Sequence, residues 1–251
     1  MSADPVTRDA EVACEEALRR IEKARRERAA ELDLSSLGLA ELPPEIFGLT
    51  SLKGLYLTRN RLSCLPPEIG ELTGLQYLRL SHNRLSALPP ELGGLTRLTR
   101  LYLSHNRLTV LPPEIGRFTA LTRLYIAHNL LSAVPPELSQ LTALTDLHLM
   151  HNLLRSLPPE MGLLPALTEL DLTGNQLTTL PSEFGQLPAL AYLDLSHNPL
   201  TMLPPEFGQL TALRLLYLEY DQPALLPPEL GRLDHLRVLR VHRNPQKEPQ
   251  A

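Results

Sequence analysis

A 23-residue phrase recurs along most of the chain, and its register never shifts. In one copy, residues 75–88 read LQYLRLSHNRLSAL, and the segment PPE follows. A fixed period of this length, without insertion or deletion, is typical of a solenoid in which each repeat packs on its neighbours. The polar slot of the phrase is filled at the same interval by Asn60, Asn83, Asn106, Asn129, Asn152, Asn175 and Asn198, then by Asp221 and Asn244.

Within each repeat, the pattern LxxLxLxxN predicts a short strand whose leucines face inward, because side chains alternate along a strand. Stacked repeats place these strands side by side, about 4.8 Å apart, in a parallel sheet. We expect the asparagine to turn inward beneath the strand, where its amide can both donate to and accept from backbone groups. The positions between the leucines then face outward, on the concave side of the solenoid.

The return segment of each repeat reads PPE in most copies, followed by apolar residues and glycine. Proline fixes φ and lacks an N–H, so the pair suits an extended entry into a helical turn. Few residues remain before the next strand, so we expect 3₁₀ or single-turn helices on the convex side. The dipole favours an acid at a helix N-terminus, and we prefer this reading to a cation site for Glu45, Glu68, Glu91, Glu114, Glu137, Glu160, Glu183, Glu206 and Glu229.

Residues 1–30 lack the repeat and predict a capping helix. Asp4 and Pro5 suit the N-cap and the first helical position. The open end of a solenoid exposes its core, so a helix that covers it is expected; a docking helix for a partner is the alternative. Oppositely charged pairs are expected at Glu16–Arg20 and Glu22–Arg26. Apolar residues recur at helical spacing at Val6, Ala10, Ala13, Cys14, Ala17, Leu18, Ile21 and Ala24.

The array is expected over residues 31–244, as about ten 23-residue turns, with a disordered tail at 245–251. Its first turn is degenerate, since Leu37 fills the asparagine slot. One later turn breaks the pattern, because Asp221 cannot donate as asparagine does and Pro223 removes an N–H. Two interpretations stay open for this turn: drift near the end of the array, or a local kink that presents Tyr217, Glu219 and Tyr220 for binding.

The outward positions of the predicted strands carry residue types that bind proteins. Tyrosine and arginine are enriched at binding hot spots. Arginines gather in the first half of this face and carboxylates in the second, which would orient a partner with a complementary face. The alternative is a solvated sheet face that merely needs polar residues. The candidate partner-binding residues are Tyr56, Tyr77, Arg79, Arg100, Tyr102, Arg123, Tyr125, Asp146, His148, Glu169, Asp171, Tyr192, Asp194 and Tyr217.

Five histidines precede the asparagine slot: His82, His105, His128, His151 and His197. Successive imidazoles should lie close together, and two of them could bridge a transition metal. No carboxylate or thiol joins them at ligand spacing, so we favour a structural role and predict no metal site. Stacked imidazolium ions would repel one another, so the row predicts sensitivity to pH below about 6.5.

Composition argues against several classes of function. A net charge of −4 gives no bulk attraction to nucleic acid or to an anionic membrane. Met1 is followed by polar residues rather than a secretory signal, and no apolar run approaches the ~20 residues of a membrane span. The two cysteines, Cys14 and Cys64, form no cysteine-rich cap, which indicates a reducing cytosol. Cys64 shares its slot with small residues and is expected to be partly buried rather than a nucleophile.

No phosphate-binding glycine loop and no nucleophile motif with matched histidine and aspartate is present in the sequence. The sequence therefore predicts a protein without catalytic activity or cofactor, which acts as a monomer on a protein partner.

With the consensus LPPEIGxLTxLxxLxLSxNxL in view, residues 12–244 resemble the intracellular, Ras-related class of leucine-rich repeats. This class occurs in Ras-suppressor and scribble-type scaffolds, plant intracellular Ras-group proteins and bacterial Roco proteins. Residues 17–39 are particularly similar to bacterial Roco and related repeat proteins. The resemblance implies an α/β fold: a right-handed leucine-rich repeat horseshoe with a concave parallel sheet, convex 3₁₀ turns and an N-terminal capping helix.

The same resemblance implies protein binding on the concave face, often linked to small GTPases or their regulators. Roco proteins also carry a GTPase domain, and some bacterial effectors join similar repeats to a ubiquitin-ligase domain. Neither domain is found in this sequence, so neither activity carries over. The preferred hypothesis is a non-catalytic, cytosolic interaction module in signal transduction. The alternative is the substrate-recognition arm of an enzyme complex, such as a ubiquitin ligase or an effector.

Overall fold

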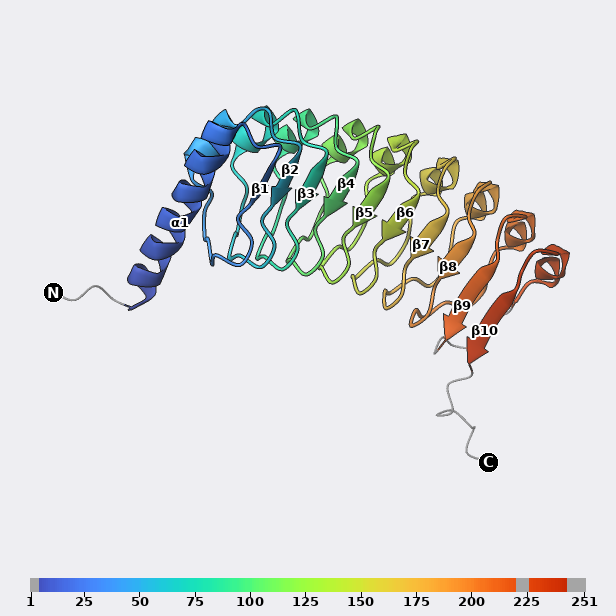
Figure 1. The fold of residues 1–251 in the computed structure, drawn as a ribbon. Coiled ribbons are helices and arrows are strands. Elements are labelled where there is room, and N and C mark those ends of the chain that lie inside the picture. The colour runs from blue at the N-terminus through green and yellow to red at the C-terminus, as the bar shows by residue number, and fades with distance from the viewer. Residues whose placement is uncertain (1–4, 220–225, 243–251) are drawn as a thin grey trace.

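The chain forms an open, curved solenoid with a helix at its N-terminal end (Figure 1). The computed structural model describes residues 5–219 and 226–242. After helix α1 (Pro5–Glu27), ten parallel strands form one sheet in chain order. Their bounds are β1 Glu31–Asp33, β2 Gly54–Tyr56, β3 Tyr77–Arg79, β4 Arg100–Tyr102, β5 Arg123–Tyr125, β6 Asp146–His148, β7 Glu169–Asp171, β8 Tyr192–Asp194, β9 Leu215–Glu219 and β10 Val238–His242.

The sheet keeps the register that the repeat predicts. Each strand pairs with the next through residues 23 positions apart, as in Leu55–Leu78 and Leu78–Leu101. Equivalent side chains therefore stand beside one another along the whole sheet. The predicted solenoid with a concave parallel sheet is confirmed.

The convex side holds short 3₁₀ helices, as expected from the proline pairs. The first proline of each pair is extended, with φ of −73° and ψ of 155° at Pro66, and the second begins the helix. The glutamate lies in the first turn of each helix, for example Glu68. The helices are η1 Pro44–Gly48, η2 Pro67–Glu71, η3 Pro90–Gly94, η4 Pro113–Arg117, η5 Pro136–Gln140, η6 Pro159–Leu163, η7 Ser182–Gln186, η8 Pro205–Gln209 and η9 Pro228–Arg232.

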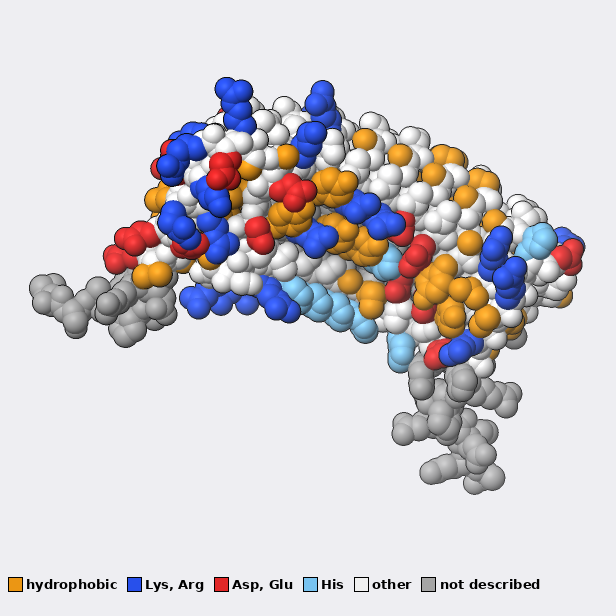
Figure 2. Space-filling model, in the orientation of Figure 1, with side chains coloured by type: hydrophobic (Ala, Val, Ile, Leu, Met, Phe, Trp, Pro, Cys, Tyr) orange, Lys and Arg blue, Asp and Glu red, His pale blue; other side chains and the backbone are white. Residues whose placement is uncertain are grey.

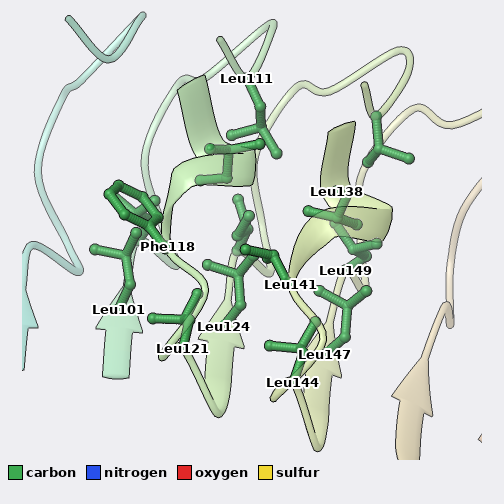
Figure 3. Packing of buried hydrophobic residues seen from close by; sticks show 14 of the residues in the cluster. Leu101, Leu111, Phe118, Leu121, Leu124, Leu138, Leu141, Leu144, Leu147 and Leu149 are labelled. Atoms are coloured by element: carbon green, nitrogen blue, oxygen red, sulfur yellow. The ribbon is translucent and has the colours of Figure 1, made fainter. Parts of the chain in front are cut away.

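A single aliphatic core runs through the array between the sheet and the 3₁₀ helices. Figure 3 shows three of its rungs, where Leu101, Leu124 and Leu147 point inward from successive strands. Phe118 and Leu138 meet them from the convex side, and all five side chains are almost fully buried. Each rung thus fills the space beside the next, which is why the rungs stabilise one another.

The asparagine ladder is the polar counterpart of this core and is formed as predicted. Asn129 is buried, and its Oδ1 accepts the backbone N–H of Leu108 at 3.0 Å. Its Nδ2 donates to the carbonyls of Leu103 at 3.0 Å and Ile126 at 3.1 Å. The same three bonds recur at Asn60, Asn83, Asn106, Asn152, Asn175 and Asn198.

Helix α1 packs against the first rung and buries the face predicted for it. Ala13, Ala17, Ile21 and Ala24 are buried and belong to the continuous core, whereas Leu18 is half-buried. The Nη1 of Arg20 donates to the Asp33 carbonyl at 3.0 Å, and the Nη2 of Arg25 donates to the Glu45 carbonyl at 3.1 Å. The two predicted ion pairs form, Glu16–Arg20 at 2.6 Å and Glu22–Arg26 at 3.5 Å.

The prediction that Cys64 is partly buried was wrong, and Cys14 does not share the buried face of helix α1. Cys14 is exposed, because the helix face turned to the core runs through Ala13 instead. Cys64 is exposed too, and the equivalent side chains Val110 and Met202 are 57% and 49% exposed. This slot lies between two buried leucines, Leu62 and Leu65, and its side chain points outward.

Some predictions fall outside the described residues. They concern the N-cap Asp4, the turn at Tyr220, Asp221 and Pro223, the last slot Asn244 and the tail 245–251. The two interpretations of the Asp221 turn therefore stay predictions.

Candidate functional site

The predicted binding residues occupy the outward positions of β2 to β9, on the concave face. Most of these side chains are partly exposed, and Figure 2 shows them as a band of mixed apolar, basic and acidic groups. Asp171 is the exception: its exposed fraction is 8%, so it contributes little accessible charge. Its carboxylate bends back, and Oδ1 accepts the backbone N–H of Thr173 at 2.9 Å.

Five outward side chains form one continuous stack across β2 to β6. The guanidinium carbon of Arg79 lies 5.4 Å from the ring centroid of Tyr56 and 4.9 Å from that of Tyr102. Tyr102 and Tyr125 stack with centroids 5.0 Å apart and planes 1° from parallel. Tyr125 then contacts the ring of His148 at 4.5 Å. Cation–π and aromatic contacts of this kind hold the side chains in fixed positions.

A parallel row of charged residues changes sign in the middle of the sheet. The guanidinium carbon of Arg100 lies 5.2 Å from the ring centroid of Tyr77, on the basic side. Arg123 and Asp146 face each other at the boundary, with Nε and Oδ2 3.6 Å apart. Because this pair neutralises part of both charges, Arg79 and Arg100 supply most of the positive charge of the basic half.

The acidic half is ordered by local hydrogen bonds. Asp194 Oδ1 accepts the Ser196 N–H at 2.9 Å, and the hydroxyl of Tyr192 donates to Asp194 Oδ2 at 3.3 Å. The Nε2 of His148 is buried and lies 3.3 Å from Glu169 Oε1, outside hydrogen-bond alignment. These contacts fix the carboxylates in position, as the stack fixes the tyrosines.

Three tyrosines of this face have a pKa above the ordinary value. Burial raises the pKa of Tyr56, and the Glu31 carboxylate adds to the effect. Burial likewise raises the pKa of Tyr125 and Tyr192, with smaller contributions from Asp146 and Asp194. Each of these three phenols therefore keeps its proton at neutral pH, and Tyr192 already donates its proton to Asp194.

The histidines form a second stack along the edge where the strands end. The ring centroids of His82 and His105 are 4.2 Å apart, those of His105 and His128 4.3 Å, and those of His128 and His151 4.5 Å. Such parallel rings direct their nitrogen lone pairs side by side rather than at one point. Among the described residues, no group of three or more metal-ligating side chains could hold a metal ion.

Sequence comparison identifies the repeat. The profile for leucine-rich repeats matches residues 27–85, 142–200 and 165–222, and a profile for a leucine-rich repeat region matches residues 67–156. The chain belongs to the leucine-rich repeat family. Comparison with curated proteins gives no match.

Several solved leucine-rich repeat structures resemble this one. A leucine-rich repeat protein of Leptospira interrogans is 35% identical, with a TM-score of 0.66 over 88% of this chain and 69% of that one. The plant peptide hormone receptor RGFR1, solved in complex with RGF2, is 34% identical, with a TM-score of 0.76 over 86% of this chain and 36% of the receptor. The repeat domain of the type III effector XopL is 25% identical, with a TM-score of 0.75 over 94% and 84% of the two chains.

Leucine-rich repeat proteins of this fold are protein-interaction modules, and repeat domains of the family are generally non-catalytic. Neither matched profile describes a catalytic domain. Within the described part of the chain, no helix has both the length and the apolarity of a membrane span.

The histidine row of this leucine-rich repeat array should make its stability depend on pH. Burial lowers the pKa of His82 and His128, and neighbouring His105 lowers both further. Below the ordinary histidine pKa of 6.5, the unfolded chain then binds more protons than the folded chain. The free energy of unfolding therefore decreases as the pH is lowered. We expect the melting temperature to fall between about pH 7.5 and about pH 5.5.

A matched variant isolates this contribution from that of the carboxylates. Asparagine tolerates the positive φ of these positions, which is 53° to 58°, so histidine can be replaced without backbone strain. The variant with His82→Asn, His105→Asn, His128→Asn and His151→Asn should lose less stability over the same pH range. Equal losses in thermal melts of the two proteins would contradict the assignment.

Two features of the site were missed from the sequence. The order of the stack, with Arg79 between two tyrosines, depends on rotamers across three strands and has no signal in the repeat itself. A hydroxyl ladder was also missed, in which Thr99, Thr122, Thr145 and Thr168 each donate to a carbonyl 23 residues earlier. The recurrence of threonine at the same interval before strands β4 to β7 was the available signal.

Proposed function

We propose that this protein is a non-catalytic interaction module that binds a protein partner on its concave face. The observation that carries the proposal is the stack from Tyr56 through Arg79, Tyr102 and Tyr125 to His148. It presents tyrosine and arginine, the residue types that dominate binding energy at protein interfaces.

The stack also lowers the entropic cost of binding. A flexible interface side chain loses about 0.5–1.5 kcal/mol of rotamer freedom when a partner immobilises it. Tyr102 and Tyr125 are already held face to face, and Arg79 is held between Tyr56 and Tyr102. Most of this ordering therefore precedes binding, and the partially exposed edges of the rings remain accessible.

The charge distribution favours one orientation of the partner. Arg79 and Arg100 lie over β3 and β4, whereas Glu169 and Asp194 lie over β7 and β8. A partner with an acidic patch over the first pair and a basic patch over the second would be steered into this orientation. The Arg123–Asp146 pair marks the boundary between the two halves.

The class of partner is a further part of the proposal. The resemblance to Ras-related repeats supports a small GTPase or one of its regulators, within cytoplasmic signal transduction, bound by one copy of this chain. The array itself, over residues 31–244 behind a cap at 1–30, supplies the rigid surface.

Truncating the centre of the face should abolish binding. We expect the variant with Tyr102→Ala, Tyr125→Ala, Arg100→Ala and Arg123→Ala to bind at least about a hundredfold more weakly, because a hot-spot truncation costs about 2 kcal/mol or more. The partner is isolated by affinity purification from the native host, identified by mass spectrometry and titrated against both proteins by calorimetry.

The matched control removes four exposed side chains outside the concave sheet, by Glu71→Ala, Glu91→Ala, Arg97→Ala and Arg117→Ala. This control should bind as the parent does. Both variants should keep the circular dichroism spectrum of the parent. Undiminished binding by the concave variant would overturn the proposal.

A second candidate function is the substrate-recognition arm of an enzyme complex, such as a ubiquitin ligase or an effector. The likeness to the repeat domain of the type III effector XopL favours it. Material purified from the native host would then contain a catalytic subunit and transfer ubiquitin, or another group, to the bound protein. Purified complexes that show no such transfer would exclude this candidate.

A further inference from the structure

A row of exposed side chains follows the asparagine ladder along one edge of the array. It begins with Arg61, Arg84 and Arg107 and continues with Leu130 and Leu153. All five are exposed, and the two leucines have exposed fractions of 46% and 40%. Figure 2 shows the basic side chains leading into the line of histidines along this rim.

The backbone beneath this edge row is held on both sides. The N–H of Arg84 donates to the Leu62 carbonyl at 2.8 Å, and that of Arg107 donates to the Leu85 carbonyl at 2.9 Å. The preceding histidines have a left-handed φ, and their N–H groups bond to the next rung, as His105 does to the Ala127 carbonyl at 2.9 Å. The spacing of the edge row is therefore fixed at one side chain per rung.

The repeat segments that carry the edge row contain no carboxylates. In the five consecutive rungs, the edge segments 59–64, 82–87, 105–110, 128–133 and 151–156 contain no aspartate or glutamate, although the whole chain has 28 acids and 24 bases. Among side chains of residues 11–219 and 226–241, no ion pair includes Arg59, Arg61, Arg84 or Arg107. On the concave face, by contrast, Arg123 faces Asp146.

At its N-terminal end the edge row opens into a pocket of about 730 Å³ beside helix α1. Arg59, Arg61 and His82 line one side of it, and Val12 and Leu37 contribute apolar surface. Glu16 also lines the pocket, but its carboxylate is bound by Arg19 and Arg20 at 2.7 Å and 2.6 Å. The hydrogen bonds from these arginines lower the pKa of Glu16.

We infer that this edge is a second binding surface, which takes an acidic–aliphatic helix of a protein partner. Carboxylates on successive turns of the helix would face Arg61, Arg84 and Arg107, and aliphatic side chains on the following turns would cover Leu130 and Leu153. The three arginines favour carboxylates in one half of the partner helix, and the two exposed leucines favour aliphatic side chains in its other half.

The spacing of the rungs favours a helix over an extended segment. The histidine rings place neighbouring rungs 4.2 to 4.5 Å apart on this edge. A helix presents side chains on one face every 4.5 to 6 Å or so, at i+3 and i+4, whereas same-face residues of a strand are about 6.7 Å apart. The spacing of helix side chains differs less from the spacing of the rungs than that of strand side chains does. Flexible arginine side chains can span this smaller difference over three rungs.

The test uses a fluorescent helical peptide of about 18 residues, or five turns, with glutamates on one face of its first half and leucines on that face of its second half. Binding is measured by anisotropy at physiological salt. Reversing the charge of the edge row, with Arg61→Glu, Arg84→Glu and Arg107→Glu, should weaken binding of the peptide at least about tenfold. Leu130→Gln with Leu153→Gln should weaken it several-fold.

A control with the same net charge separates this site from general electrostatic attraction. It carries Arg97→Glu, Arg117→Glu and Arg232→Glu, all at exposed positions away from the edge row. Peptide affinity should stay within about twofold of the parent in this control, and in the concave Tyr102/Tyr125/Arg100/Arg123 variant. Because that concave variant tests the other face, the two proposals can fail separately.

Three results would overturn the inference. One is an equal loss of affinity in the edge and control variants. Another is equal affinity for a scrambled peptide of the same composition. The third is binding to phosphatidylserine vesicles that depends on the same three arginines while the peptide does not bind, which would assign the edge to a membrane surface.

Discussion

Replacing Asn129 with aspartate should lower the free energy of unfolding by about 3–5 kcal/mol. The two side chains have the same shape, but a carboxylate cannot donate. The carbonyls of Leu103 and Ile126 would each lose one of two amide donors, keeping Asn106 and Asn152 respectively. Both carbonyls would also face a buried negative charge at about 3 Å. Asn129 lies in the middle of the ladder, so the defect cannot be relieved by fraying of an end.

Urea unfolding followed by circular dichroism measures this loss. Gln176→Glu is the matched control, because it makes the same change of charge at an exposed position two rungs away. We expect the control to change the free energy of unfolding by less than about 0.5 kcal/mol. Similar losses in the two variants would mean that the ladder is not a main source of stability.

The second large effect is expected at Gly185, where the convex 3₁₀ helices come into contact. A Cβ at this position would overlap the backbone carbonyl oxygen of Glu206 and lie 2.7 Å from its carbonyl carbon. Since the obstacle is backbone of helix η8, it cannot rotate away, and the two rungs must move apart. Gly185→Ala should therefore cost about 3 kcal/mol, at the upper end of overpacking effects.

Gly231 offers a control within the same repeat slot. Because no described atom lies within 4 Å of a Cβ built there, Gly231→Ala should be nearly neutral in thermal melts. If both substitutions lower the melting temperature equally, the cost arises from glycine's conformation and not from the packing of one rung on the next.

The period of the sequence was sufficient to predict the sheet, its register and the asparagine ladder. The strands pair residues 23 positions apart, and the asparagine bonds lie within one repeat or reach the preceding one, as from Asn83 to Leu80 and Leu57. The repeated motif therefore specifies its own partners. Placement of the outward residues followed from the alternation of side chains along each strand. The Ras-related subfamily and the small-GTPase partner have no such basis in geometry and stay predictions.

The contacts that differ from rung to rung could not be predicted. The near-complete burial of Asp171 depends on its bond to the Thr173 N–H, and the sandwich of Arg79 depends on tyrosines one rung away on either side. The exposed slot of Cys64 was misread because small residues fill it in several rungs, and small size does not imply burial. The edge row of arginines and leucines occupies one variable position of the repeat, and nothing in the repeat itself marks that position as a binding surface.

Site-specific photocrosslinking tests the concave binding face most directly. Tyr125 is replaced by p-benzoylphenylalanine in one protein and Arg117, on the convex side, in another, and each is irradiated with the isolated partner. The account predicts a covalent adduct with the partner from position 125 and none from position 117. Adducts from position 117 alone would show that the partner binds the convex side and would contradict the account.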